Sequence, residues 1–224
     1  KGRCEALVVD GKEIPIIARE DRYGPMGWAD FDVEMVIDAT GYCRTGELAA
    51  RHTEEGAQKV IVTMPMVGED LTVIMGVNHH AYDPERHHIL SASSCTANCL
   101  APVADVLQKR VGVIEGMMTT VHAYTNSQAL LDKVREDPRL SRSAHLNIVP
   151  TTTGATEEAA HIIPSLKDKF LGSALRVPIP TVSLLDLTAH LAEPLSIEDV
   201  NRAFRDAAQG YLKGYLAVCE EELV

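Results

Sequence analysis

The chain has 224 residues, a length that suits one large domain or two modest ones. Its formal net charge of −11, with no long cluster of Lys and Arg, disfavours binding to nucleic acid or to an anionic membrane. Five cysteines without the dense spacing of a disulfide scaffold, and apolar runs too short to cross a bilayer, predict a reduced, cytoplasmic protein.

The first part of the chain alternates between short apolar strands and a helix. In chain order the pattern predicts a hairpin over residues 6–17 with its turn at Asp10-Gly11, strands over 33–39, 59–63 and 71–77, and a helix over 47–55. This order is typical of a parallel α/β sheet, whose ligands bind beyond the carboxyl ends of the strands, here at Thr40-Gly41. No G-x-G-x-x-G run is present, so the pattern alone indicates no particular cofactor.

A second segment begins near Ser93 with a helix that runs to about Arg110, because apolar residues recur there at helical spacing. Pro102 lacks an amide hydrogen and suits only the first turn of a helix. The helix therefore starts either near Asn98, with Cys95 just before it, or at Cys95 itself, with a bend at Pro102.

The rest of this segment mixes strands and helices. The pattern predicts a strand over 117–124, a long polar loop over 125–146, a helix after Thr151-Thr-Thr-Gly154, a strand over 182–191 with Leu185, Leu187, Ala189 and Leu191 on one face, and a capped helix from Ser196 to Gly210 with Ile197, Val200, Phe204 and Ala207 on its core face. We expect an α+β unit after the α/β one.

Cys95 is the candidate nucleophile. Hydroxyls and an amide flank it, and His122 follows near the end of a predicted strand. A thiol beside an imidazole can ionise, and the thiolate is the nucleophile. The alternative is a structural cysteine with an unrelated histidine, which the spacing leaves open. A metal pair of Cys95 with Cys99 is disfavoured, because zinc sites need four ligands and no second cysteine pair exists.

Two other features could bind an anion. Thr151-Thr-Thr-Gly154 precedes a helix and presents hydroxyl and amide groups to one point, although a plain helix cap is the more common use of such threonines. Arg176 lies between apolar residues at the mouth of a strand. Its guanidinium suits a phosphate group or, alternatively, a structural ion pair.

Six short runs of the chain carry a family resemblance. They are Ile37-Asp-Ala-Thr-Gly41, Met75-Gly-Val-Asn-His79, Ser93-Ser-Cys-Thr-Ala-Asn-Cys-Leu-Ala-Pro102, Met118-Thr-Thr-Val-His-Ala-Tyr-Thr-Asn-Ser-Gln128, Asn147-Ile-Val-Pro-Thr-Thr-Thr-Gly154 and Arg176-Val-Pro178. Together they resemble the phosphorylating glyceraldehyde-3-phosphate dehydrogenases. The resemblance covers nearly the whole chain and is most specific around Cys95.

The resemblance implies a partial Rossmann-type dinucleotide-binding domain over residues 1–92 and an α+β catalytic domain over 93–224. It implies that Cys95 attacks the aldehyde of glyceraldehyde 3-phosphate, that hydride passes to NAD or NADP, and that inorganic phosphate cleaves the thioester to 1,3-bisphosphoglycerate. His122 would keep Cys95 ionised and act as the base. The resemblance also implies a homotetramer in which the 125–146 loop reaches a neighbouring subunit.

The other site residues implied by the resemblance fall into three groups, and none of them is expected to bind a metal ion. Thr125, Arg176 and Arg139 would hold the substrate phosphate; Ser94, Thr153 and Gly154, with Thr96 adjoining, would bind the attacking phosphate; and Thr40, Gly41 and Thr63 would line the dinucleotide.

The chain departs from the family pattern in places. Ala97 replaces the second threonine of Cys-Thr-Thr-Asn, and Leu140 follows Arg139 where the family has one or two arginines. The family's glycine-rich turn would lie before Lys1 and its C-terminal segment after Val224, so we expect a longer protein, and this chain alone should not bind cofactor properly. The choice between NAD and NADP is normally made in the part before Lys1.

Two other functions stay open. An erythrose-4-phosphate dehydrogenase would use the same chemistry on a different aldehyde. A non-catalytic homologue that serves as a scaffold belongs to another class, and Leu140 gives that reading some support.

Overall fold

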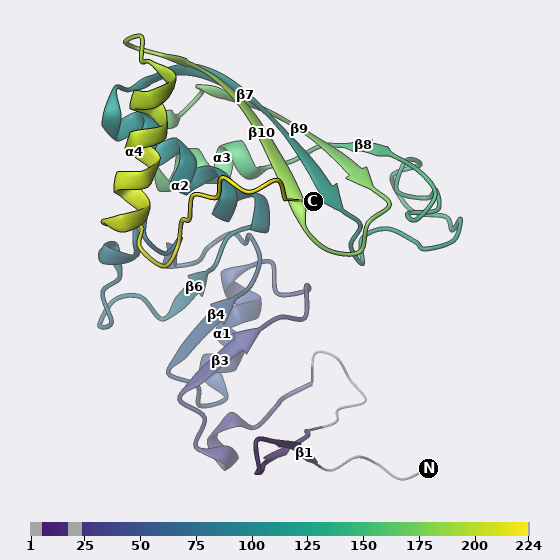
Figure 1. Cartoon of the computed structure of the whole chain (residues 1–224). Helices are drawn as coiled ribbons and strands as arrows, with labels where there is room; N and C mark the ends of the chain where they lie inside the picture. The colour runs from purple at the N-terminus through teal and green to yellow at the C-terminus, as the bar shows by residue number, and fades with distance from the viewer. Residues whose placement is uncertain (1–5, 18–23, 224) are drawn as a thin grey trace.

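A computed structural model describes residues 6–17 and 24–223 (Figure 1). The chain opens with the antiparallel hairpin of β1 (Ala6–Val9) and β2 (Lys12–Pro15). Its turn residues Asp10 and Gly11 have φ angles of 50° and 77°, the left-handed conformation that a tight hairpin turn requires. The hairpin is therefore confirmed.

A four-stranded parallel sheet follows, as the alternating pattern predicts. Its order is β3 (Met35–Asp38), β4 (Lys59–Val62), β6 (Ile89–Ser91) and β5 (Leu71–Thr72). Helix α1 (Gly46–Glu54) packs against β4, and its Ala49 joins Val60 and Val62 in a small core. Two short 3-10 helices, η1 (Trp28–Phe31) and η2 (His79–Ala81), lie in the connections.

The predicted strand over residues 71–77 is wrong beyond Thr72. The backbone turns at Ile74, whose carbonyl accepts from Val77 at 3.1 Å and from Asn78 at 3.2 Å. The Asn78 side chain closes this turn by accepting from the Ile74 amide at 2.8 Å. The apolar run there buries Ile74 and Val77 in a turn rather than in a strand.

The second sheet is mixed and forms the α+β part. Its order is β10 (Ser183–Leu191), β7 (Val113–Ala123), β9 (Phe170–Val177) and β8 (Val149–Thr151). Strands β7 and β9 are parallel, whereas β10 and β8 run antiparallel to their neighbours. Strand β7 starts four residues before the predicted position, and the three-residue strands β6 and β8 are too short for the sequence pattern to detect.

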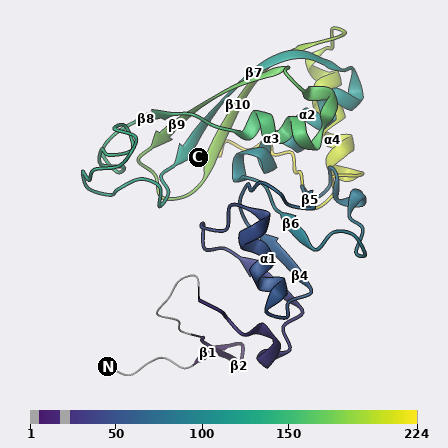
Figure 2. The same cartoon turned by 180° about the vertical axis from the view of Figure 1, so that it is seen from behind.

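Helices α2 (Cys95–Arg110) and α3 (Ala155–Ile162) cover one face of this sheet, followed by the 3-10 helix η3 (Pro164–Leu166) (Figure 2). Leu100 and Met118 are fully buried between helix and sheet. Leu185, Leu187, Ala189 and Leu191 of β10 pack against the same core, as predicted. Helix α2 starts at Cys95, so Pro102 lies inside it and cannot donate to a carbonyl.

Helix α4 (Ile197–Gln209) packs against α2 and begins at the predicted cap, where Ser196 Oγ accepts from the Asp199 amide at 3.1 Å. Phe204 and Ala207 face the core, but Ile197 is 83% exposed. The prediction for Ile197 is wrong because the packed face of α4 is formed by its later turns.

The opposite face of the second sheet has no helix over it among the described residues. Met117 of β7, Leu171 of β9 and Leu184 of β10 are each more than half exposed there. The connection between β7 and β8, which contains residues 125–146, has neither helix nor strand, as expected. Among the described residues, no helix is long and apolar enough to cross a membrane.

Candidate active site

Cys95 is the first residue of α2, and its sulfur lies 3.1 Å from Nε2 of His122. Ser94 caps the helix, because its Oγ accepts from the Ala97 amide at 3.1 Å. The amide groups of the first turn give a helix start a partial positive charge, which favours an anion such as a thiolate. The structure thus answers the open question about the helix start and brings the predicted cysteine and histidine into contact.

His122 reaches this position because it is the penultimate residue of β7. Arg176 is the penultimate residue of the parallel neighbour β9 and is paired with His122 in the strand register. Residues paired in register on parallel strands point to the same face, here the face that α2 covers. Ser183 of β10 pairs with His122 from the other side, and its Oγ accepts from the Ala123 amide at 3.2 Å.

Two contacts at Nδ1 hold the His122 ring. Nδ1 lies 2.7 Å from the Ala123 carbonyl oxygen and 2.8 Å from Nη1 of Arg176, which also donates to that carbonyl at 3.0 Å. A protonated Nδ1 donates to Ala123 and leaves Nε2 free to take the proton of Cys95. A bare Nδ1 accepts from Arg176 and leaves the proton on Nε2, facing the sulfur. The ring can therefore exchange a proton with Cys95 without turning.

The guanidinium of Arg176 has one donor that no described residue uses. Its Nε is buried and has no hydrogen-bond partner among the described residues. Burial lowers the pKa of Arg176, and the negative charge of a Cys95 thiolate opposes that lowering. No carboxylate forms a salt bridge with Arg176 in the described part of the chain, so the structural ion-pair interpretation finds no support.

A cavity of about 60 Å³ opens beside Cys95. Cys95, Thr96, Cys99, Thr120 and His122 are among its lining residues. Burial raises the pKa of Cys99, and the negative charge of Cys95 raises it further. Both effects favour the thiol form of Cys99.

The predicted phosphate-binding cluster lies where α2 and α3 begin. Gly154 occupies the position before the first turn of α3, and Thr153 Oγ1 accepts from the Ala155 amide at 3.3 Å. The Ser94 amide donates to Oε2 of Glu158 at 2.8 Å. The sequence pattern gives no sign of Glu158, because a contact across 64 residues leaves no local signal.

Of the predicted phosphate-binding residues, Thr125 and Arg139 have no hydrogen bond to Cys95 or His122 within the described residues. Both are exposed at the start of, or within, the 125–146 loop. Thr125 Oγ1 lies 2.9 Å from Ser127 Oγ, and the Arg139 amide donates to Asp137 at 2.8 Å. No contact joins either side chain to His122 or Arg176 within the described residues.

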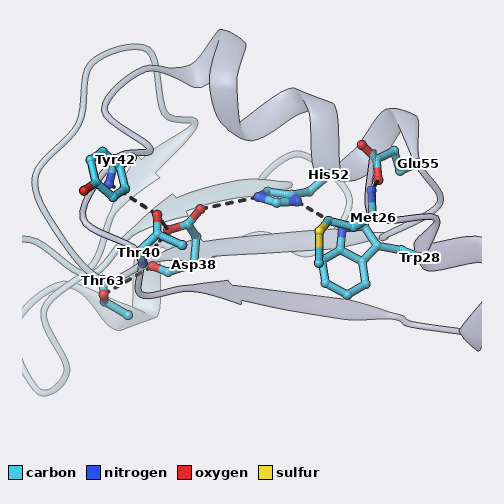
Figure 3. A network of polar contacts seen from close by, with 8 residues as sticks. All are labelled: Met26, Trp28, Asp38, Thr40, Tyr42, His52, Glu55 and Thr63. Atoms are coloured by element: carbon cyan, nitrogen blue, oxygen red, sulfur yellow. Dashed lines mark hydrogen bonds and ion pairs between the residues drawn. The ribbon is translucent and has the colours of Figure 1, made fainter. Parts of the chain in front are cut away.

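Thr40, Gly41 and Thr63 form a separate group at the carboxyl ends of β3 and β4 (Figure 3). Asp38 organises this group, since its Oδ1 accepts from the Thr40 amide at 2.9 Å and from Thr40 Oγ1 at 2.7 Å. Thr63 Oγ1 donates to the Asp38 carbonyl at 3.2 Å. Gly41 has a φ of +77°, and a Cβ there would meet nothing within 4 Å, so the turn is open on that side.

Comparison with known proteins shows the family. The model for "Glyceraldehyde 3-phosphate dehydrogenase, C-terminal domain" matches residues 94–224. The chain belongs to the glyceraldehyde-3-phosphate dehydrogenase family. It is 49% identical over 218 residues to the glyceraldehyde-3-phosphate dehydrogenase of Geobacillus stearothermophilus and 48% identical to that of Priestia megaterium. Each alignment covers 97% of this chain and 65% of the relative, so the chain spans less than two thirds of their length.

Membership of this family implies a nicotinamide cofactor, and the open turn at the ends of β3 and β4 fits part of such a ligand. Dinucleotides bind at this edge of parallel α/β sheets. The turn offers the Thr40 and Thr63 hydroxyls and, at Gly41, a backbone that a ligand can approach closely. The sequence contains no G-x-G-x-x-G run, so the described turn offers no glycine-rich loop for the pyrophosphate of such a ligand.

Asp38 contacts His52, which in turn contacts Trp28. The sequence pattern does not predict these contacts. Oδ2 of Asp38 lies 3.4 Å from His52 Nε2, and Trp28 Nε1 donates to His52 Nδ1 at 3.0 Å (Figure 3). Because Nδ1 accepts from Trp28, the ring proton of a neutral His52 lies on Nε2 and faces Asp38. Burial, followed by the charge of Asp38, raises the pKa of the neighbouring Cys43 to about 11.

Proposed function

We propose that the protein carrying this chain oxidises glyceraldehyde 3-phosphate to 1,3-bisphosphoglycerate through a thioester on Cys95. The observation that supports this most strongly is the 3.1 Å contact between the Cys95 sulfur and His122 Nε2, beside a guanidinium with an unpaired Nε. A nucleophile, a base and a fixed positive charge lie together at one edge of the sheet.

The reaction uses each of these groups in turn. His122 holds the proton of Cys95 while the thiolate forms a bond to the aldehyde carbon, which gives a hemithioacetal. His122 takes the hydroxyl proton of this adduct as it is oxidised to the thioester, and a nicotinamide cofactor, NAD or NADP, would supply the hydride acceptor when bound. An oxygen of inorganic phosphate then attacks the acyl carbon, the carbon–sulfur bond breaks, and Cys95 leaves as a thiolate.

Two anion positions follow from the same proposal. Arg176 and Thr125 hold the substrate phosphate, with Arg139 as a further candidate ligand. Ser94, Thr153 and Gly154, with Thr96 adjoining, hold the attacking phosphate where the first turns of α2 and α3 begin. Thr40, Gly41 and Thr63 line the cofactor.

We propose further that the protein is a cytoplasmic homotetramer. The face of the second sheet that no described helix covers carries Met117, Leu171 and Leu184, all more than half exposed. Apolar side chains on an uncovered sheet face are typical of a subunit interface. Val134 of the 125–146 loop, 92% exposed, fits a loop that reaches a neighbouring subunit.

The test is a kinetic comparison in the intact protein that carries this chain. We expect Cys95→Ser to lower kcat by about three orders of magnitude and His122→Asn by about two, measured with glyceraldehyde 3-phosphate, phosphate and either NAD or NADP. Cys219→Ser, at an exposed cysteine, is the control. Normal turnover by Cys95→Ser would exclude the thioester mechanism.

Parallel assays decide between the alternatives. A higher kcat/KM for erythrose 4-phosphate than for glyceraldehyde 3-phosphate would point to the second aldehyde as the substrate. No turnover of either aldehyde by the unaltered protein would favour a non-catalytic scaffold.

A further inference from the structure

Glu158 places a carboxylate at the start of the helix that carries the nucleophile. Its Oε2 accepts from Ser93 Oγ at 2.5 Å and from the Ser94 amide at 2.8 Å. Ser93 is 3% exposed and has a φ of 61°. The carboxylate therefore binds the two residues directly before Cys95, although it belongs to α3.

The same carboxylate also lies beside the start of α3. Oε1 of Glu158 is 3.7 Å from the position that a Cβ on Gly154 would occupy. Ser94 and Gly154 precede the first turns of α2 and α3, and helix starts attract anions through free amide groups and the helix dipole. An anionic group of the protein itself thus occupies the space where these two helix starts come together.

Other negative charges surround this carboxylate. Glu158 lines a cleft of about 510 Å³ together with Glu69, Asp70 and Glu157, and His161 is the one group in the lining that can become positive. Within the described residues, Glu158 is the carboxylate of this group that accepts a hydrogen bond from Ser94, whereas the Glu157 carboxylate accepts from Thr156.

We propose that Glu158 determines how tightly the acyl-enzyme binds its anionic acceptor, inorganic phosphate, and that its negative charge weakens this binding. The inference rests on the proposed function of Cys95 as the acyl carrier. Ser94 and Gly154 are two of the residues proposed to bind the attacking phosphate. Glu158 accepts the hydrogen bond of the Ser94 amide and places a negative charge next to Gly154. Phosphate has to displace this carboxylate or bind beside it.

The variant Glu158→Gln separates charge from shape. A glutamine carbonyl can still accept from the Ser94 amide, so the turn keeps its contact while the negative charge is lost. We expect the KM for inorganic phosphate to fall by about three- to tenfold, because one unfavourable charge interaction is removed. Glu157→Gln is the matched control, because Glu157 is exposed in the same helical turn and its Oε2 accepts from Thr156 Oγ1. The KM of this variant for phosphate should change little.

A second readout needs neither cofactor nor turnover. The ratio of Cys95 alkylation rates with anionic iodoacetate and neutral iodoacetamide should rise in Glu158→Gln and in Glu158→Ala, but not in Glu157→Gln. A purely structural role of Glu158 predicts a different result. Glu158→Ala would then lose turnover, while Glu158→Gln would leave the KM for phosphate and the alkylation ratio unchanged. That pattern would overturn the proposal.

Single-turnover experiments keep this inference apart from the proposed function. A burst of reduced nicotinamide without phosphate, with an acyl group on Cys95, supports the acyl carrier. If the burst occurs and Glu158→Gln leaves the KM for phosphate unchanged, the role of Glu158 is wrong. If the unaltered protein with cofactor and aldehyde gives no burst, the proposed function itself is wrong, and the inference falls with it.

Discussion

Arg176 contacts His122, and we propose that it also binds the phosphate of the substrate. Nη1 is used by His122 and the Ala123 carbonyl, while Nε has no partner among the described residues. A guanidinium can serve both because its donors point in different directions from one planar group. A lysine has one charged nitrogen and cannot reproduce this arrangement.

We therefore expect Arg176→Lys to raise the KM for glyceraldehyde 3-phosphate by about tenfold or more, because the directed contact with the substrate phosphate is lost. Steady-state kinetics with unphosphorylated glyceraldehyde is the control. Its KM should change little, since it has no phosphate to bind. An equal rise in KM for both aldehydes would contradict a role of Arg176 in phosphate binding.

At the scale of elements, the contacts of Trp28, His52 and Asp38 tie η1 and α1 to the end of β3. Asp38 is 8% exposed and fixes the turn at Thr40. The three side chains thus connect helix α1 to the turn at Thr40, which we propose as part of the cofactor site (Figure 3).

Replacing His52 by Phe should break this connection. We expect a loss of about 1–2 kcal/mol in the free energy of unfolding, because a buried carboxylate and the Trp28 indole each lose a partner. Trp28 is the only tryptophan in the sequence, so its fluorescence in the folded state reports the change directly. His80→Phe, at an exposed histidine in η2, is the control, and identical urea curves and spectra for both variants would contradict the account.

Local patterns predicted the elements whose signal is local. Asp10-Gly11 gave the hairpin, Ser196 the start of α4, and the alternation in residues 185–191 the buried face of β10. The prediction of a strand over residues 71–77 is wrong beyond Thr72, because an apolar run does not distinguish a strand from a buried turn. The prediction that Ile197 faces the core is wrong, because helical periodicity does not show how far along a helix its packing partner extends.

The candidate site divides in the same way. Cys95 and His122 lie in short runs with recognisable neighbours, so both were predicted, and the structure brings them together. Asp38, His52 and Glu158 act through contacts across 14 to 65 residues, which no local pattern contains. The helix start at Cys95 also needed the structure, because Pro102 left two possible positions in the sequence.

At the scale of the whole molecule, the second sheet has one face that α2 and α3 cover and one face that no described helix covers. Met118, Thr120 and His122 of β7 point toward α2, whereas the residues between them point away. The alternation of β7 thus places His122 on the side of α2, where Cys95 lies, and Met117 on the exposed apolar face.

Leu171→Glu tests the proposed tetramer, since a carboxylate on this face cannot be buried between subunits without a partner. We expect the mass measured by light scattering to fall from that of a tetramer to that of a smaller species. Ile197→Glu, at a residue that is also exposed but lies on α4, should leave the mass unchanged. An unchanged mass for Leu171→Glu would show that this face is not an interface.

The most direct test of the account is the rate at which each cysteine reacts with iodoacetamide at pH 7, followed by mass spectrometry. Cys43 and Cys99 should react slowly, because burial raises the pKa of both thiols. We predict that Cys95 reacts about tenfold or more faster than the exposed Cys219, and that His122→Asn abolishes this difference. Equal rates for Cys95 and Cys219 in the unaltered protein would contradict an activated nucleophile at the start of α2.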